Sequence, residues 1–117
     1  MTISTNEISV AVEGHRFGEA ASFSYPAIIT YSLASNSQSN QFELRYNGTN
    51  LTESTLVGSS QNINTGDTIA NIGANINLGS FFNGNYGEII IFNRQLKTSE
   101  IEEVEKYLSQ KWKININ

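Results

Sequence analysis

The chain of 117 residues contains no cysteine, one proline, one histidine and one aspartate. Without cysteine there can be neither a disulfide framework nor a thiolate metal site, and a zinc site is excluded in practice. Charged residues make up only 15% of the chain, the net charge is −4, and the basic residues are scattered. Binding to nucleic acid is therefore not expected.

Long apolar runs are also missing. The longest one, residues 89–92, is far too short to cross a bilayer, so no membrane partner is expected. Residues 1–6 lack the basic start and the apolar stretch of a signal peptide, so export by that route is not expected either.

The residues that take the place of the missing charges are asparagine, serine, threonine, glutamine and nine glycines. This composition is typical of short strands joined by polar turns, and repeated isoleucine-rich runs argue against disorder. A length of 117 residues fits one domain, so we interpret residues 1–117 as a single, mostly-β module.

Alternating apolar residues predict strands in the first part of the chain. Residues 7–13 place three aliphatic side chains on one face, and residues 27–33, which follow Pro26, show a similar alternation. Residues 14–18 include two glycines and predict a loop, and the polar run 34–40 predicts another.

The clearest local signal is a β-hairpin. Residues 42–46 alternate strictly between apolar and polar side chains, and Asn47 and Gly48 follow directly. Asparagine and glycine accept the positive φ angles that a two-residue type I′ turn requires. We therefore predict a return strand from Thr49 to Glu53.

The pattern is weaker downstream of the hairpin. Residues 68–72 and 75–78 fit short strands, with glycine-containing turns before them. Residues 88–93 are apolar on both faces, which predicts a central strand covered on both sides.

The end of the chain changes to helical spacing, which predicts a helix over residues 98–113. Thr98 or Ser99 can supply the N-cap oxygen. The glutamates between residues 100 and 105 are interpreted as a solvated face, and Trp112 as a core residue. The predicted apolar stripe consists of Ile101, Val104, Leu108 and Trp112.

Three motifs at the end of the chain resemble a known family. Residues 82–89 read Phe-Asn-Gly-x-x-Gly-Glu-Ile, residues 96–100 read Leu-x-x-x-Glu, and residues 107–112 read Tyr-Leu-x-x-Lys-Trp. This succession of strand, turn and closing helix resembles the end of concanavalin A-like lectin/glucanase domains, which include laminin-G-type modules. The resemblance covers residues 72–113 and extends upstream to the Asn-Gly-Thr hairpin.

The resemblance implies an antiparallel jelly-roll sandwich with one C-terminal helix. Modules of this family are usually much longer, so this chain would be a shortened sandwich or the C-terminal part of one. Relatives often cap the closing helix with serine or aspartate where this chain has Lys97, so we expect the cap to move to Thr98.

Modules with this ending are common in phage and large-virus structural proteins and in bacterial surface proteins, and the family often binds sugars. The resemblance therefore implies a non-enzymatic structural or assembly module of a virion (phage tail or capsid-associated) or of a cell surface. Its partners would be other protein subunits, in a homo-oligomer or with virion proteins, and its loops would contact host glycans. Two alternatives stay open: an autonomous carbohydrate-binding module and a fragment of a larger surface adhesin.

Catalysis is not expected. Related folds include glycosidases that use two close carboxylates on one strand, but no Glu-x-Asp-x-x-Glu run occurs here. His15 lies in the predicted loop without a serine or cysteine motif nearby. Asp67, with Asn62 and Asn64, is a weak candidate for a calcium site, against the plainer interpretation of a polar turn. No other cofactor is expected.

Aromatic rings that border loops are the usual means of stacking on sugars. The candidate binding residues are Tyr25, Phe81 and Tyr86, with the amides of Asn83 and Asn85. The alternative for Phe82 and Tyr86 is packing inside the sandwich.

Overall fold

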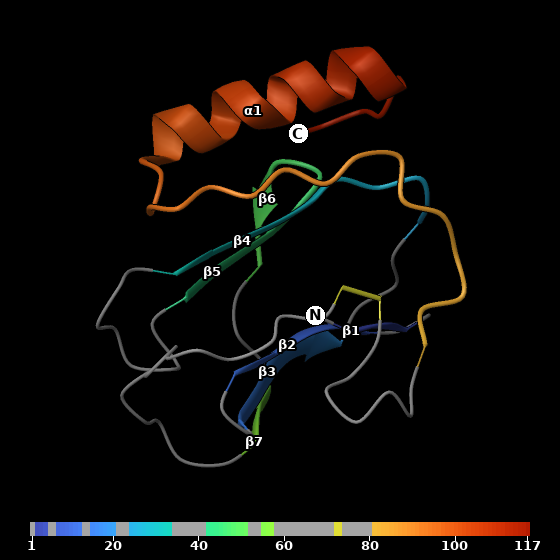
Figure 1. Ribbon diagram of the computed structural model, residues 1–117, viewed down its shortest axis with the longest axis vertical. Coiled ribbons are helices and arrows are strands. Elements are labelled where there is room, and N and C mark those ends of the chain that lie inside the picture. The colour runs from blue at the N-terminus through green and yellow to red at the C-terminus, as the bar shows by residue number, and fades with distance from the viewer. Residues whose placement is uncertain are drawn as a thin grey trace.

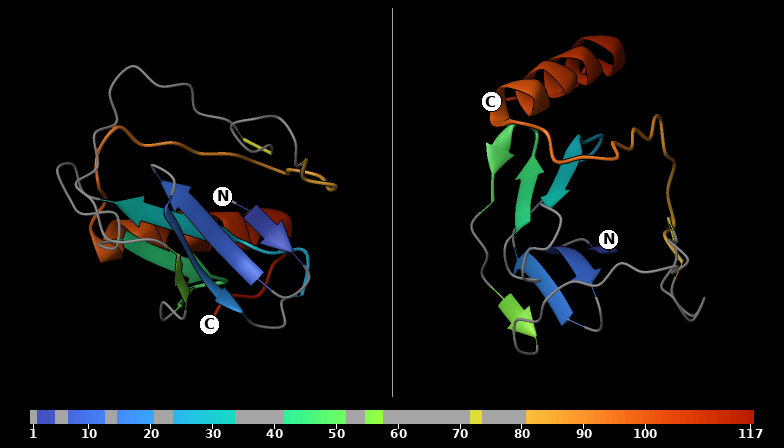
Figure 2. Two further views of the ribbon diagram at one scale, coloured as in Figure 1. Left: turned by 90° about the horizontal axis from the view of Figure 1, so that it is seen from below. Right: turned by 60° about the vertical axis from the view of Figure 1, so that its left-hand side comes forward.

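The structure is a computed structural model that describes residues 2–4, 7–12, 15–20, 24–33, 42–51, 55–57, 72–73 and 81–117. It contains a four-stranded sheet, a three-stranded sheet and one C-terminal helix. The helix, the three-stranded sheet and the four-stranded sheet follow one another from top to bottom in Figure 1, and the second view of Figure 2 shows the same succession.

The four-stranded sheet has the order β1-β2-β3-β7, with every neighbouring pair antiparallel. Its strands are β1 (Thr2–Ser4), β2 (Glu7–Val12), β3 (His15–Ala20) and β7 (Thr55–Val57). The strand predicted over residues 7–13 is thereby confirmed.

The loop predicted over residues 14–18 is wrong, because β3 begins at His15. The register of β2 and β3 runs from Glu7 opposite Ala20 to Val12 opposite His15. The segment carries no apolar alternation of its own, but backbone hydrogen bonds to a neighbouring strand are enough to make it a strand, because strand propensity depends on context. His15 therefore lies at the start of a strand.

The three-stranded sheet has the order β4-β5-β6 and is antiparallel. Its strands are β4 (Ile29–Leu33), β5 (Phe42–Tyr46) and β6 (Thr49–Asn50). The strand predicted over residues 27–33 is confirmed from Ile29 onward. The predicted hairpin is also confirmed, although its return strand is shorter than predicted.

The hairpin turn has the predicted backbone, with φ of 47° at Asn47 and 83° at Gly48. The Asn47 side-chain oxygen accepts a hydrogen bond from the Ile28 amide at 2.8 Å. On the other side of the turn, the Asn117 amide donates to the Asn47 carbonyl at 2.9 Å. The turn is thus anchored both to the approach to β4 and to the segment that follows the helix.

The C-terminal helix α1 (Thr98–Trp112) confirms the predicted helix, but the cap expected at Thr98 is wrong. The N-cap residue is Lys97, whose amide donates to the Glu100 carboxylate at 2.8 Å. A carboxylate in the first turn can replace a capping hydroxyl because it both accepts this hydrogen bond and complements the helix dipole. Among the described residues, no helix is long and apolar enough to cross a membrane.

Helix α1 packs on the face of the three-stranded sheet that carries Thr30 and Arg45, which lie opposite each other in the register of β4 and β5. The buried apolar residues of this part are Ile28, Leu44, Ile101 and Ile114. Ile101 confirms the predicted apolar stripe at its first position.

Several predictions fall outside the described residues. These are the loop over residues 34–40, the short strands over residues 68–72 (except Ile72) and 75–78, and the weak calcium candidate Asp67 with Asn62 and Asn64.

Candidate functional site

Four of the five predicted binding residues lie together in one loop, residues 81–86, which we call the aromatic loop. Phe81 is 73% exposed, and Tyr86, Asn83 and Asn85 are also exposed. Exposed rings beside exposed amides can stack on an apolar face of a ligand while the amides form hydrogen bonds.

The conformation of the aromatic loop is stabilised by packing between two of its rings and by contacts with Gly73. The rings of Phe82 and Tyr86 pack with their centroids 4.9 Å apart and tilted by 43°. The Phe82 amide donates to the Gly73 carbonyl at 2.7 Å, and a β-carbon at Gly73 would lie 3.3 Å from the Tyr86 hydroxyl. Phe82 is half-buried, so it acts in packing while Phe81 stays free to contact a ligand.

Tyr25 stands apart from the other candidates, because it lies beside the hairpin. Its neighbour Ser24 exchanges two backbone hydrogen bonds with the Tyr46 hydroxyl, at 2.9 and 2.6 Å. Partial burial, and secondarily Tyr46, raises the pKa of the Tyr25 phenol. Tyr25 is exposed, but these contacts assign it to the hairpin end of the three-stranded sheet.

The central strand predicted over residues 88–93 is wrong. Residues 88–92 form neither strand nor helix, and Ile89, Ile90, Ile91 and Phe92 are between 41% and 77% exposed. We call residues 89–92 the apolar segment. A run that is apolar on both faces is typical of a covered strand, but residues 88–92 pair with no strand that the structure describes. The chain leading into α1 runs below the helix in Figure 1, on the side toward the sheets.

The apolar segment is fixed to α1 at both ends by polar contacts. Before it, the Glu88 carboxylate accepts hydrogen bonds from Trp112 Nε1 and Lys111 Nζ, both at 3.0 Å. After it, the Arg94 guanidinium forms two hydrogen bonds to Glu100, at 2.7 and 2.9 Å. The hydrogen bonds from Trp112 and Lys111 lower the pKa of the Glu88 carboxyl. The segment is therefore held along the helix although its side chains are exposed.

Trp112 is not the core residue that the helical stripe predicts. Its side chain is 42% exposed, and its ring lies against the backbone of Gly87, where a β-carbon would come within 3.3 Å. Tyr107 is exposed as well, and its hydroxyl accepts a hydrogen bond from Lys111 at 2.9 Å. Trp112 and Tyr107 thus lie half-exposed on the side of the helix next to Glu88, where the apolar segment begins.

A groove of about 310 Å³ runs between the apolar segment and α1. Its walls carry both apolar and charged side chains. The lining residues are Ile90, Phe92, Arg94, Leu96, Glu100, Glu103, Val104 and Tyr107.

The Glu100 carboxyl beside this groove has a strongly lowered pKa. Hydrogen bonds from Arg94, and secondarily from the Lys97 amide, lower its pKa from 4.5 to about 2. A carboxyl whose pKa is lowered by folding stabilises the fold above pH 4.5, and this contribution is lost as the pH falls toward 2.

We therefore expect an NMR titration of the Glu100 side chain to give a midpoint near 2. Arg94→Ala should move that midpoint upward, toward the ordinary value, because it removes the largest cause of the shift. Lys111→Ala, which removes a contact of Glu88 instead, should leave the Glu100 midpoint in place. An Arg94→Ala variant with an unchanged Glu100 midpoint would contradict this assignment.

Sequence analysis missed a buried ion pair between the sheet and the helix. Glu105 is only 2% exposed, which corrects the expectation that all glutamates between residues 100 and 105 lie on a solvated face. Its carboxylate accepts two parallel hydrogen bonds from Arg45 Nε and Nη2, both at 3.0 Å, and one from the Thr30 hydroxyl at 2.8 Å. Arg45 also donates to the Gly48 carbonyl at 2.8 Å.

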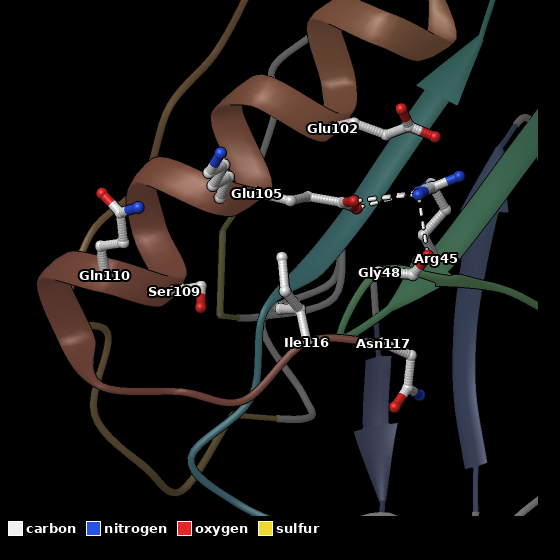
Figure 3. Close-up of a pocket in the computed structure, with 9 residues that line it drawn as sticks. Arg45, Gly48, Glu102, Glu105, Ser109, Gln110, Ile116 and Asn117 are labelled. Atoms are coloured by element: carbon white, nitrogen blue, oxygen red, sulfur yellow. Dashed lines mark hydrogen bonds and ion pairs between the residues drawn. The ribbon is translucent and has the colours of Figure 1, made fainter.

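The ion pair lies beside a second recess, of about 490 Å³, between α1 and the hairpin (Figure 3). Figure 3 shows Glu105 pointing from the helix toward Arg45. The side chains of Arg45 and Glu105 satisfy each other, so the recess has no unpaired buried charge to offer a ligand. We interpret the pair as the device that docks the helix on the sheet.

Comparisons with protein-family models, with curated proteins and with solved structures found no match to this chain. In the described part of the chain there is also no group of three or more histidine, aspartate or glutamate side chains that could hold a metal ion. Two candidate surfaces stand out from the geometry: the apolar segment with its groove, and the aromatic loop.

Proposed function

We propose that this chain is a non-enzymatic structural module of a virion or a cell surface that acts by assembling with other protein subunits through the apolar segment. The observation that carries the proposal is the exposure of four consecutive apolar side chains, Ile89 to Phe92. Contiguous exposed apolar patches mark interaction sites in soluble proteins, and an unpaired extended segment is readily paired by another chain.

The apolar segment is held at both ends, which supports a role in assembly rather than that of a flexible linker between the sheets and the helix. Contacts of Glu88 and Arg94 with the helix fix both ends of the segment. A binding segment that is held in position before its partner arrives loses less conformational entropy on association. The groove beside it adds the apolar walls of Val104 and Tyr107 as further contact surface.

The proposal includes a concanavalin A-like fold, a shortened antiparallel jelly-roll. Two antiparallel sheets, an Asn-Gly hairpin and a closing helix on one sheet are the parts that such a module requires. Within residues 72–113, the closing helix supports the resemblance, whereas residues 88–92 do not form the strand of that family ending. The location, on a virion or a cell surface, rests on that resemblance.

The test is the native mass of the purified chain, measured by light scattering over a range of concentrations, with circular dichroism on the same sample. We expect a folded oligomer that dissociates on dilution. A folded monomer at every concentration that also binds no hydrophobic dye would overturn the proposal, because it would show that no apolar surface awaits a partner.

A second candidate function is an autonomous carbohydrate-binding module. The aromatic loop supports it, because Phe81 and Tyr86 are exposed beside two exposed amides. Aromatic rings and amides are the groups that fix small polar ligands with apolar faces. A folded monomer in the light-scattering experiment would favour this function, and screening against an array of glycans would then identify the ligand class.

A further inference from the structure

We infer that the partner of the apolar segment is a second copy of this chain, paired antiparallel to the first about Ile91. This inference rests on the proposed assembly function and adds the identity and the register of the partner. It follows from three observations: the alternation of the segment, the charges that flank it, and its composition.

Side chains along the segment alternate between two directions. Glu88 and Arg94 contact α1, and Ile90 and Phe92 line the groove beside the helix, so the even-numbered positions face the helix. Ile91, between them, is the most exposed residue of the segment at 77%. This alternation is that of a strand, although residues 88–92 belong to no sheet.

Two identical strands can pair antiparallel only in certain registers. In an antiparallel pair, residues directly opposite each other have their side chains on the same face of the sheet. The two-fold axis that relates the two copies is perpendicular to the sheet, so each residue points to the same face in both copies. Even positions must then oppose even positions, so one residue on the axis opposes its own copy. The possible centres within the segment's middle are Ile90, Ile91 and Phe92.

The flanking charges select one of these registers. With Ile91 on the axis, Glu88 of each copy opposes Arg94 of the other, and Ile90 opposes Phe92. Centring on Ile90 would place Glu88 opposite Phe92, and centring on Phe92 would place Arg94 opposite Ile90. Opposite charges directly across two strands stabilise their pairing, whereas a charge opposite an apolar side chain gains nothing.

Both charged side chains can take part without leaving the helix. The Arg94 side chain is 57% exposed even while it contacts Glu100. The Glu88 side chain is 23% exposed, and its Oε1 has only a long contact of 3.4 Å with the Tyr107 hydroxyl. Each group therefore keeps hydrogen-bonding capacity toward solvent, which a second copy can use.

The composition of the segment favours pairing with another strand. Three isoleucines and one phenylalanine have high β-propensity, and the segment contains neither charge nor proline. Short stretches of this kind associate edge to edge unless a charge or a proline interrupts them. The charges at its two ends restrict this association to one register.

The test uses the full chain and three variants: Glu88→Arg, Arg94→Glu, and the two changes combined. Each single variant places like charges opposite each other twice in a dimer with itself, so we expect its self-association to weaken about tenfold. An equimolar mixture of the two single variants restores opposite charges between copies. We expect the mixture to associate about tenfold more tightly than either single variant alone. The double variant also restores opposite charges between copies but breaks both contacts with its own helix, so we expect its association to lie between that of the single variants and that of the wild type.

Analytical ultracentrifugation measures the association, and circular dichroism confirms that each variant is folded. Recovery in the mixture cannot come from contacts within one chain, because each chain keeps its own broken contact with Lys111 or Glu100. A mixture that associates no better than its two components would overturn the antiparallel register, even if the wild type oligomerises and the assembly function stands. A wild-type chain that stays monomeric but binds a hydrophobic dye would overturn the second copy as the partner.

Discussion

Glu105→Ala is expected to lower the free energy of unfolding by about 2–4 kcal/mol, a large share of the stability of a domain of this size. The substitution removes the closer of two carboxylate partners from the Arg45 guanidinium, which is only 6% exposed and keeps only Glu43, at 3.2 Å. It also deprives the Thr30 hydroxyl of its acceptor. A buried charge that loses its two-point partner cannot recover its hydration, so the loss exceeds that of an ordinary hydrogen bond.

Urea denaturation followed by circular dichroism measures this effect. Glu102→Ala is a matched control, because Glu102 lines the same recess from the same helix but is exposed, and its change should stay within about 0.5 kcal/mol. The double change Arg45→Met/Glu105→Leu should be less destabilising than Glu105→Ala, because it removes both charges. Equal losses for Glu102→Ala and Glu105→Ala would show that burial of the pair contributes nothing.

Ile91→Lys is expected to weaken self-association at least about 100-fold, because it places two lysines opposite each other on the two-fold axis of the proposed dimer. Each lysine would also lose hydration inside an apolar contact. The isolated chain should keep its stability within about 0.5 kcal/mol, because Ile91 is 77% exposed. Association would be measured by light scattering and stability by denaturation.

Phe81→Lys is the control for Ile91→Lys. Phe81 is 73% exposed, so the substitution makes the same kind of change on an equally accessible apolar side chain outside the apolar segment. We expect it to leave self-association unchanged. If both variants weakened association alike, the contact would spread over the aromatic loop, and the apolar segment would not be its centre.

Sequence reasoning succeeded where a signal is local. The hairpin could be predicted because Asn47 and Gly48 have the backbone preferences of its turn, and the helix because four apolar residues share one spacing. The resemblance to concanavalin A-like modules stays a prediction, since the jelly-roll depends on how segments outside the described residues are arranged.

The rest could not be predicted, because it depends on contacts between distant parts of the chain. Glu105 belongs to a run of glutamates, and it differs from its neighbours through its contacts with Arg45 and Thr30, which lie 60 and 75 positions earlier in the chain. Likewise, residues 88–93 have the composition of a covered strand, but composition does not say which neighbour covers it. Trp112 could not be placed from the sequence for the same reason. Helical spacing assigns it to the apolar stripe, but its indole donates a hydrogen bond to Glu88 and stays at the surface.

Gly48 meets two independent demands. Its φ of 83° suits the turn, and asparagine would tolerate that angle nearly as well. However, any β-carbon at this position would lie 2.8 Å from the Asn117 carbonyl oxygen, which is closer than real β-carbons approach. Glycine is thus required at position 48 both by the turn and by the close approach of Asn117. An Asn-Asn turn would preserve the hairpin and still displace Asn117, so a side chain in the turn would require a compensating shift in the segment that follows the helix.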